Sequence, residues 1–468
     1  MNTTLLLLLA YSAGLIGLGL WLGRRVSSAG GFFVAGRSLG PGLLFATVLA
    51  ANIGAGTTIG AAGLGYRDGL AGWWWVGSAG VGTLVLALWV GPRIWAVARA
   101  RGHLTLGDYL DDRYGPSVRA IIAMLLWLGT LALLAGQLIA MSDIFTVVAG
   151  WPRGWGVVVG GVVATTYFAA GGLMVAAWVN LVQLVVMVAG FGIALPWAMS
   201  AAGGWEAVVA AAPADGLNFW QGGESGWIYL ALVAPGFVIS PGLIQKAYGA
   251  VDARAIRIGL AATAVALLVF AAVPPLLGMV ARVYDPALAD HEFALPLVLT
   301  VGVPLWLGTL GLAAVFSAEL SSSDAILFML STSLSRDLYR RFVRPDASDT
   351  SVLRVARVAA LTGGALGILL AAVLPGVIEA LTIFYALLAV SLFVPVLGGL
   401  YTRRAGSPEA LAAIAFGVML WVAVRTGLID NLPPLFTASV VGLLGSAAGF
   451  GVVLGARAIL RRDPHSSR

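Results

Sequence analysis

Long apolar stretches follow one another along almost the whole chain, with short polar segments between them. A spanning helix needs about 17 to 25 predominantly apolar residues, because the hydrocarbon core of a bilayer is about 30 Å thick. By that measure the pattern predicts an all-α polytopic membrane protein with about thirteen transmembrane helices. The expected ranges are 4–22, 41–64, 73–97, 117–141, 157–176, 178–199, 227–243, 256–283, 303–333, 353–374, 376–399, 408–426 and 433–459.

The amino-acid composition agrees with a membrane protein and limits the kinds of functional site that the chain can form. Of 468 residues, 60% are hydrophobic and 10% charged, against about 25% charged in soluble domains. Because there is no cysteine, neither a disulfide framework nor a thiolate metal site is expected. The histidines at 103, 291 and 465 all fall in predicted loops, so we expect no histidine metal centre within the membrane and no enzyme.

The basic residues behind the net charge of +6 lie in alternate loops. Arginine and lysine accumulate on the cytoplasmic side of membrane proteins, so this spacing is a topological signal and nucleic acid is not an expected partner. We expect an integral, multi-pass protein of the plasma (inner) membrane, a monomer in the lipid bilayer, with its N-terminus outside and its C-terminus cytoplasmic. The inner loops hold Arg24, Arg25, Arg37, Arg99, Arg101, Arg113, Lys246, Arg254, Arg257, Arg336, Arg340, Arg341, Arg344, Arg403 and Arg404.

The second apolar stretch contains the segment Leu-Ala-Ala-Asn-Ile-Gly-Ala-Gly-Thr-Thr-Ile-Gly at 49–60. Gly54, Gly56 and Thr57 are poor choices for a helix that only faces lipid, since glycine costs about 1 kcal/mol per helix position relative to alanine. Asn52 also needs a hydrogen-bond partner. The segment predicts an interrupted helix that lines a cavity near the membrane midplane. Close helix packing through small residues is the alternative.

The seventh apolar stretch is interrupted in the same way, by Ala-Pro-Gly at 234–236 and Ser-Pro-Gly at 240–242. Each interrupted stretch opens a group of five, and because five is odd the second group must be inverted. This arrangement is typical of alternating-access transporters, although proline kinks that serve packing alone are the other reading. We divide the chain into an N-terminal helix and loop at 1–40, repeats at 41–199 and 227–400, an external loop at 200–226, and two final helices with a tail at 401–468.

Polar residues gather within the ninth stretch, where Ser317, Glu319, Ser321 and Asp324 stand among apolar neighbours. Such groups are costly in a membrane unless they face water, an ion or each other, and oxygen atoms are the ligands of hard cations. Alternatively, the serine hydroxyls bond to carbonyls of their own helix. Glu379, which opens the eleventh stretch, either faces the pathway or lies at the outer interface.

Several segments resemble the sodium/solute symporter family, which includes carriers of proline, sugars, pantothenate and sialic acid. The similar segments cover nearly the whole chain: Phe-Phe-Val-Ala-Gly-Arg-Ser-Leu-Gly at 32–40, Gly-Gly-Leu at 171–173 leading to Trp-Val-Asn at 178–180, Ala313 to Ser317, and Leu-Ser-Arg-Asp-Leu-Tyr at 334–339. The resemblance implies a leucine-transporter-like core of two inverted five-helix repeats, with solute held between the first and sixth core helices.

The resemblance also implies a sodium ion as the bound cofactor, held by backbone carbonyls that match Ala50, Ile53 and Ala314 and by two adjacent hydroxyls. Ser317 matches the first hydroxyl, but Ala318 stands where the second is expected. The family usually has an aspartate at position 180, where this chain has Asn180, and Leu320 replaces a polar residue of a second sodium site. Gln245 and Lys246 match a Gln-Arg pair for which a structural role near the cytoplasm is expected.

We therefore expect a symporter that moves a small organic solute inward with sodium by alternating access. Coupling to protons through Glu319 or Glu379, or exchange without an ion, is a second hypothesis, and a solute sensor without net transport is a third. Coupling candidates are Glu319, Ser321, Asp324 and Glu379. Solute-binding candidates are Asn52, Gly54, Gly56, Thr57, Pro235, Gly236 and Ser240.

Overall fold

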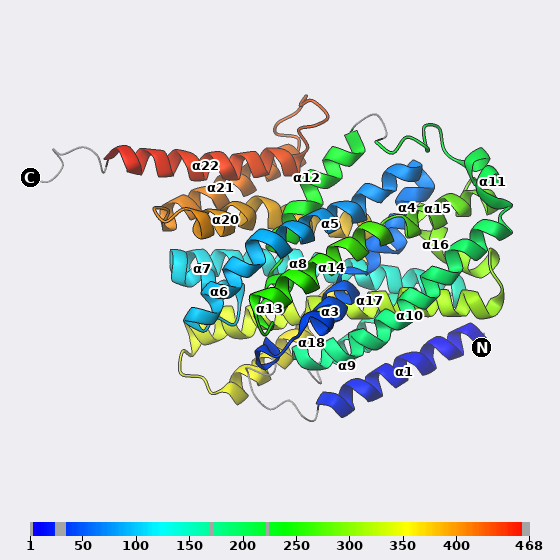
Figure 1. Ribbon diagram of the computed structural model, residues 1–468, viewed down its shortest axis with the longest axis horizontal. Coiled ribbons are helices and arrows are strands. Elements are labelled where there is room, and N and C mark those ends of the chain that lie inside the picture. The colour runs from blue at the N-terminus through cyan, green and yellow to red at the C-terminus, as the bar shows by residue number, and fades with distance from the viewer. Residues whose placement is uncertain (1–2, 24–33, 169–171, 221–223, 461–468) are drawn as a thin grey trace, which may run out of the picture.

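The computed structural model describes residues 3–23, 34–168, 172–220 and 224–460. Within them the chain is a bundle of tilted helices whose two ends correspond to the ends of the long axis in Figure 1. The described chain begins with α1 at one edge, and α22 ends toward the opposite end of the bundle. Phe32, Phe33 and Gly171, which carry part of the family resemblance, and the tail at 461–468 lie outside the described residues.

The first half of the bundle contains α1 (Thr3–Gly23), α3 (Pro41–Asn52), α4 (Ile59–Asp68), α5 (Trp73–Val85), α6 (Gly91–Arg101), α7 (Leu106–Tyr114), α8 (Pro116–Ala149), α9 (Arg153–Phe168), α10 (Gly172–Ala201) and α11 (Gly204–Ala211). The second contains α12 (Glu224–Ile239), α13 (Pro241–Tyr248), α14 (Ala253–Phe270), α15 (Val273–Tyr284), α16 (Ala294–Val301), α17 (Leu305–Thr332), α18 (Asp349–Val373), α19 (Val377–Leu388), α20 (Val394–Tyr401), α21 (Ser407–Arg425) and α22 (Ala438–Leu460).

Every apolar stretch expected from the sequence contains helix, and the all-helical polytopic class is confirmed. Ten stretches of the described chain are long and apolar enough to cross a membrane, so the count of thirteen stays a prediction. Helices α7, α11 and α16 lie in segments expected to be loops. The apolar pattern did not predict them because each has only eight or nine residues, too few to span a membrane.

The break expected in the second apolar stretch is present between α3 and α4. Helix α3 ends at Asn52, Ile53 and Gly54 are extended, and a short turn at Ala55–Thr57 precedes α4. The hydroxyl oxygen of Thr57 accepts a 2.8 Å hydrogen bond from the Gly54 amide, which gives the freed backbone a local partner. A Cβ atom on Gly54 would lie 2.2 Å from Ser322 Oγ, so only glycine allows this close approach to α17.

The seventh stretch is also broken, but at one place and not two. Pro235 lies inside the continuous helix α12, and the chain leaves helical geometry only at Ser240, with φ −51° and ψ 120°. Pro241 then occupies the first turn of α13, where its missing amide hydrogen costs no hydrogen bond.

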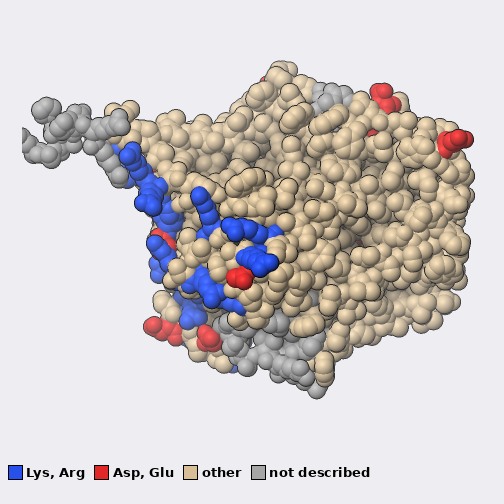
Figure 2. Space-filling view, in the orientation of Figure 1, with Lys and Arg blue, Asp and Glu red and all other residues tan. Residues whose placement is uncertain are grey.

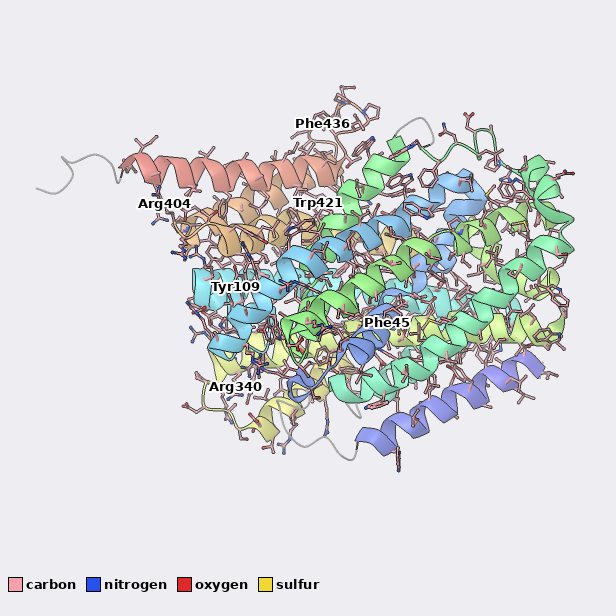
Figure 3. The ribbon with its side chains drawn as sticks, in the orientation of Figure 1. Phe45, Tyr109, Arg340, Arg404, Trp421 and Phe436 are labelled. Atoms are coloured by element: carbon pink, nitrogen blue, oxygen red, sulfur yellow. The ribbon has the colours of Figure 1, made fainter. Side chains whose placement is uncertain are left out.

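Helix α17 lies at the centre of the bundle. In the span Leu305–Val343, 83% of its most apolar window is buried, against 33% for α22 at the edge. Figure 2 shows lysine and arginine gathered toward the end of the molecule where α22 finishes, with acidic residues visible at the opposite end. Tyr109, Arg340 and Arg404 lie toward the basic end, while Phe436 lies above α21 and α22 (Figure 3).

Candidate ion and solute site

A cavity of about 70 Å³ lies beside the breaks in both interrupted helices. Helices α8, α17 and α19 supply the rest of its wall. Of the seven solute-binding candidates, six line this cavity, and Pro235 does not. The six are Asn52, Gly54, Gly56, Thr57, Gly236 and Ser240.

The cavity wall has an apolar side and a polar side. Phe237, Leu381 and Phe384 form part of the apolar side. The polar side includes Gln137 of α8, whose Oε1 accepts a 2.9 Å hydrogen bond from the Ala55 amide and so holds the break in place. The Nδ2 atom of Asn52 is buried without a hydrogen-bond partner among the described residues. Sequence analysis did not find Gln137, which is the single amide side chain of α8.

Two adjacent serine hydroxyls of α17 meet the backbone carbonyls that the break in α3 frees. Ser321 Oγ lies 2.6 Å from the carbonyl oxygen of Ala50 in α3 and 3.0 Å from that of Ala318, which belongs to its own helix α17. Ser322 Oγ lies 3.0 Å from the carbonyl oxygen of Ala51 and 3.1 Å from that of Ile53. We call these four carbonyl and two hydroxyl oxygens the oxygen cluster. Both serines are at most 5% exposed, and neutral oxygens at this density suit a hard monovalent cation.

The oxygen cluster contains the carbonyls of Ala50 and Ile53, two of the four residues expected to bind sodium, but its hydroxyls come from a different turn of α17 than Ser317. The hydroxyl of Ser317 donates to the Ala313 carbonyl at 2.6 Å and lies 2.7 Å from the hydroxyl of Tyr11, so it faces α1. Serines recur at four-residue spacing in this helix, and i and i+4 share a face. Sequence spacing alone therefore could not show which of these turns contacts α3, and the assignment of Ser317 to the sodium site stays a prediction.

The carboxyl groups of α17 lie on either side of the oxygen cluster. Glu319 is fully buried, and its Oε1 accepts a 2.8 Å hydrogen bond from Thr58 Oγ1 at the start of α4. Asp324, three residues after Ser321 in the same helix, is 1% exposed. Glu379, the remaining carboxylate among the coupling candidates, pairs with Arg425 at the surface, where its side chain is 43% exposed. It is not among the residues that line the cavity.

Lys246 does not have the peripheral position that its family match suggested. It is 2% exposed, lines the cavity, and its Nζ donates a 2.6 Å hydrogen bond to the Thr47 carbonyl oxygen of α3. Asn180 of α10 reaches the same residue, with Nδ2 3.3 Å from Thr47 Oγ1. Three helices thus meet at Thr47, one turn before Ala50.

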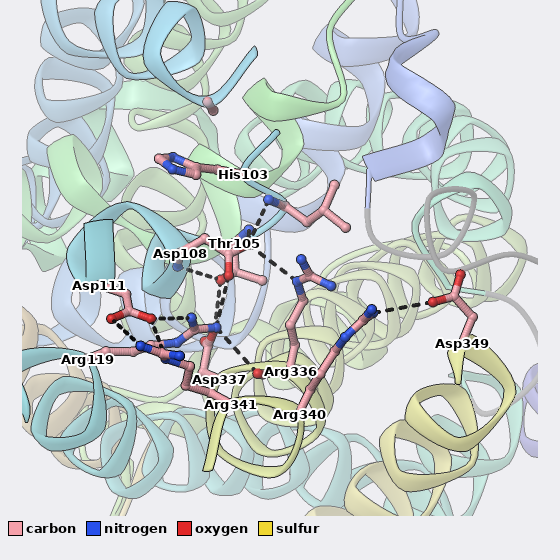
Figure 4. Close-up of polar contacts among 12 residues, drawn as sticks. His103, Thr105, Asp108, Asp111, Arg119, Arg336, Asp337, Arg340, Arg341 and Asp349 are labelled. Atoms are coloured by element: carbon pink, nitrogen blue, oxygen red, sulfur yellow. Dashed lines mark hydrogen bonds and ion pairs between the residues drawn. The ribbon is translucent and has the colours of Figure 1, made fainter. Parts of the chain in front are cut away.

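Beyond the cavity, the basic end of the bundle holds an ion-pair network (Figure 4). Arg119 of α8 is 5% exposed and lies 2.9 Å from Asp108, 3.1 Å from Asp111 and 2.8 Å from Asp337. Arg336 is 3.3 Å from Asp108. Burial raises the pKa of Asp108. The charges of Arg336 and Arg119 and two backbone amide hydrogen bonds lower it by more than burial raises it, so the pKa of Asp108 lies below its usual range. The network joins α7, α8 and the end of the α17 span.

These features define a multi-pass membrane transporter with two broken helices around a central site. The sequence profile of the sodium:solute symporter family matches residues 32–417, and the chain belongs to this family. It is a sodium-coupled secondary transporter.

Among similar proteins, the sodium/pantothenate symporter of Escherichia coli is 27% identical, over 95% of this chain and 96% of its own length. The high-affinity proline transporter of Bacillus subtilis is 27% identical, over 90% and 92%. A Na+-coupled sialic acid symporter in a substrate-bound, outward-open state has the same fold, with a TM-score of 0.84 at 17% identity, covering 97% of this chain and 98% of its own. Nothing in these similarities favours a proton-coupled carrier or a sensor.

Proposed function

We propose that the protein imports a small organic solute together with sodium, and that the ion binds at the oxygen cluster between α3 and α17. The observation that carries this proposal is the meeting of the Ser321 and Ser322 hydroxyls with carbonyl oxygens of Ala50, Ala51, Ile53 and Ala318. These groups carry no fixed charge, so an ion can enter and leave without leaving a buried anion behind.

The solute would bind in the adjacent cavity, in contact with the breaks in α3 and α12–α13. Ser322 lines this cavity and also belongs to the oxygen cluster. An ion that fixes Ser322 and the Gly54 backbone therefore shapes the solute site, which gives coupling a direct physical route. The apolar wall from Phe237, Leu381 and Phe384 suits a solute with a hydrocarbon body and a few polar groups.

For orientation, we propose that the basic end of the bundle faces the cytoplasm, with the N-terminus outside and the C-terminus inside. The gathering of arginines at one end (Figure 2) supports this, since positive residues accumulate on the inner side. Alternating access would then move the two inverted repeats, 41–199 and 227–400, about the central site of a monomer.

The first test is the thermal stability of the purified protein in sodium, potassium or N-methyl-D-glucamine chloride at matched ionic strength. A ligand that binds only the folded state raises stability by about 2.7 kcal/mol at 100 times its dissociation constant. We expect a sodium-specific rise that Ser322→Ala weakens at least tenfold in apparent affinity. Ser317→Ala is the matched control, because its hydroxyl faces Tyr11 and not α3.

The same variants then go into proteoliposomes for sodium-gradient uptake of pantothenate, proline, glucose and choline, the solutes in the names of the relatives. A sodium shift that survives Ser322→Ala but disappears in Ser317→Ala would refute the oxygen cluster as the ion site. Uptake that ignores the sodium gradient for every transported solute would refute sodium coupling itself.

A further inference from the structure

Another cavity, of about 640 Å³, lies beside the last turns of α22, at the end of the molecule where lysine and arginine gather (Figure 2). Its wall is formed by the loop between α20 and α21, the first turn of α21 and the end of α22. Helix α22 is long and apolar enough to cross a membrane, and its Val452 and Ile459 are 70% and 71% exposed. The cavity therefore lies at the lipid-facing edge of the bundle, near the level at which α22 leaves the hydrocarbon core.

The charged residues of this wall are two arginines and one carboxylate. Glu409 is fully buried, and both of its carboxylate oxygens accept hydrogen bonds from Arg457 Nη1, at 2.9 and 2.8 Å. The Nε and Nη2 atoms of Arg457 take no part in these bonds. Arg404 is exposed beside the end of α22 (Figure 3) and has no ion-pair or hydrogen-bond partner among the described residues. The wall thus carries one positive charge in excess, with guanidinium donors left for an anion.

The apolar side of the cavity is a trough along α22. Gly451, Leu454 and Gly455 line it and share one face of the helix. A Cβ atom on Gly451 or Gly455 would meet nothing within 4 Å, so the space above both glycines is open. A Cβ on Gly449, by contrast, would lie 2.8 Å from a backbone oxygen of α21, so that glycine serves helix packing. The trough runs from Arg457 toward the middle of α22 over about 9 Å, at 1.5 Å per residue.

We propose that this cavity binds one anionic phospholipid, with its phosphate between Arg404 and Arg457 and the start of an acyl chain in the trough. Guanidinium groups match phosphate oxygens through paired hydrogen bonds, and basic pockets between membrane helices suit anionic headgroups. A zwitterionic lipid fits less well, because its own cation is repelled by Arg404. The bound lipid holds the loop between α20 and α21 against the end of α22. The site shares no residue with the central cavity or the oxygen cluster, so it does not depend on the proposed function.

The test measures the thermal stability of the purified, delipidated full-length protein in detergent, since a ligand that binds the folded state raises stability by mass action. The probes are dioleoylphosphatidylglycerol, dioleoylphosphatidylcholine and inorganic phosphate. We expect a saturable rise with phosphatidylglycerol and little change with the other two. Arg404→Gln should weaken the apparent affinity for phosphatidylglycerol by about tenfold, because a charge-assisted contact with the phosphate is lost. Arg403→Gln is the matched control, since Arg403 is also exposed but does not line the cavity.

Gly455→Leu tests the placement of the acyl chain. Its side chain enters open space, so the lipid-free protein should keep its stability while its affinity for phosphatidylglycerol falls. An affinity unchanged by Gly455→Leu overturns the placement in the trough. Equal responses to phosphatidylglycerol and phosphatidylcholine overturn the proposal, and so does an equal response to inorganic phosphate, which would indicate a site for soluble anions. A loss of affinity in Arg403→Gln as large as in Arg404→Gln also overturns it, because only general attraction to the basic end would remain.

Discussion

Two buried polar regions of this protein are made from different groups. The oxygen cluster between α3 and α17 uses serine hydroxyls and backbone carbonyls, none of them charged. The network at the basic end uses full charges, with Arg119 touching three carboxylates at once. Neutral oxygens can exchange an ion at small cost, whereas a buried charge that loses its partner is left uncompensated. The oxygen cluster therefore suits repeated binding and release of an ion, and the charged network suits a structural role that holds helices together.

Breaking the charged region should have the largest effect. Arg119→Met leaves Asp108, Asp111 and Asp337 without their shared cation, and removal of one partner from a buried ion pair typically costs about 3–5 kcal/mol. We expect a loss of that size in the free energy of unfolding, measured by denaturant titration in detergent. Sodium affinity should stay within about twofold, because the oxygen cluster does not include Arg119.

Arg341→Met is the control for this effect. Arg341 also contacts Asp111, at 2.6 Å, but its side chain is 44% exposed. Exposed pairs contribute about 0.2–1 kcal/mol, so the loss should be correspondingly small. Equal losses for Arg119→Met and Arg341→Met would show that the network is not held through its buried arginine.

Ion binding at the oxygen cluster should be lost when the position of the break in α3 is changed. In Gly54→Ala the added Cβ would lie 2.2 Å from Ser322 Oγ and 2.7 Å from Gln137 Oε1. The break in α3 must then move away from α17, and we expect the sodium-specific rise in thermal stability to weaken at least tenfold, about 1.4 kcal/mol in binding free energy. Gly42→Ala in the same helix is the control, because a Cβ there meets nothing within 4 Å. Sodium affinity unchanged in Gly54→Ala would argue against ion binding at this break.

The comparison also explains what could be read from the sequence. Composition and glycine-proline interruptions were sufficient to predict an all-helical transporter with breaks near Asn52 and Ser240, because a membrane penalises free backbone groups strongly. The sequence could not show which residues pack against the break in α3. Ser317 and Ser321 share a face of α17, and only the way α3 crosses α17 determines which of them contacts the break. The sequence placed Lys246 in a loop, but it lies in α13, and its long side chain reaches the Thr47 carbonyl of α3.

Acid should weaken the charged region and spare the neutral one. The pKa of Asp108 lies below its usual range in the folded protein, and an unfolded aspartate titrates near about 3.9. The stabilising contribution of Asp108 is therefore complete above that pH and is lost as the pH falls through the lower folded value. The loss should be smaller than in Arg119→Met, because Arg119 keeps its other partners.

Unfolding free energy measured from about pH 5 downward tests this, since the transition begins below the pKa of the unfolded aspartate, about 3.9. The acid-induced loss should be smaller in Asp108→Asn, which has no carboxylate to titrate at this position. Identical pH profiles for the wild type and Asp108→Asn would contradict the lowered pKa as a source of stability.

The smallest effect should come from a charge pair that belongs to neither region. Glu379 and Arg425 contact each other with side chains 43% and 50% exposed, and such pairs contribute about 0–1 kcal/mol because water screens them. Glu379→Gln should change stability by no more than that and should leave the sodium titration and the pH dependence of uptake as in the wild type. A carboxylate that carried the coupling proton would instead abolish that pH dependence when neutralised. Loss of the pH dependence of uptake in Glu379→Gln would therefore place ion coupling at the Glu379–Arg425 pair and contradict coupling at the oxygen cluster.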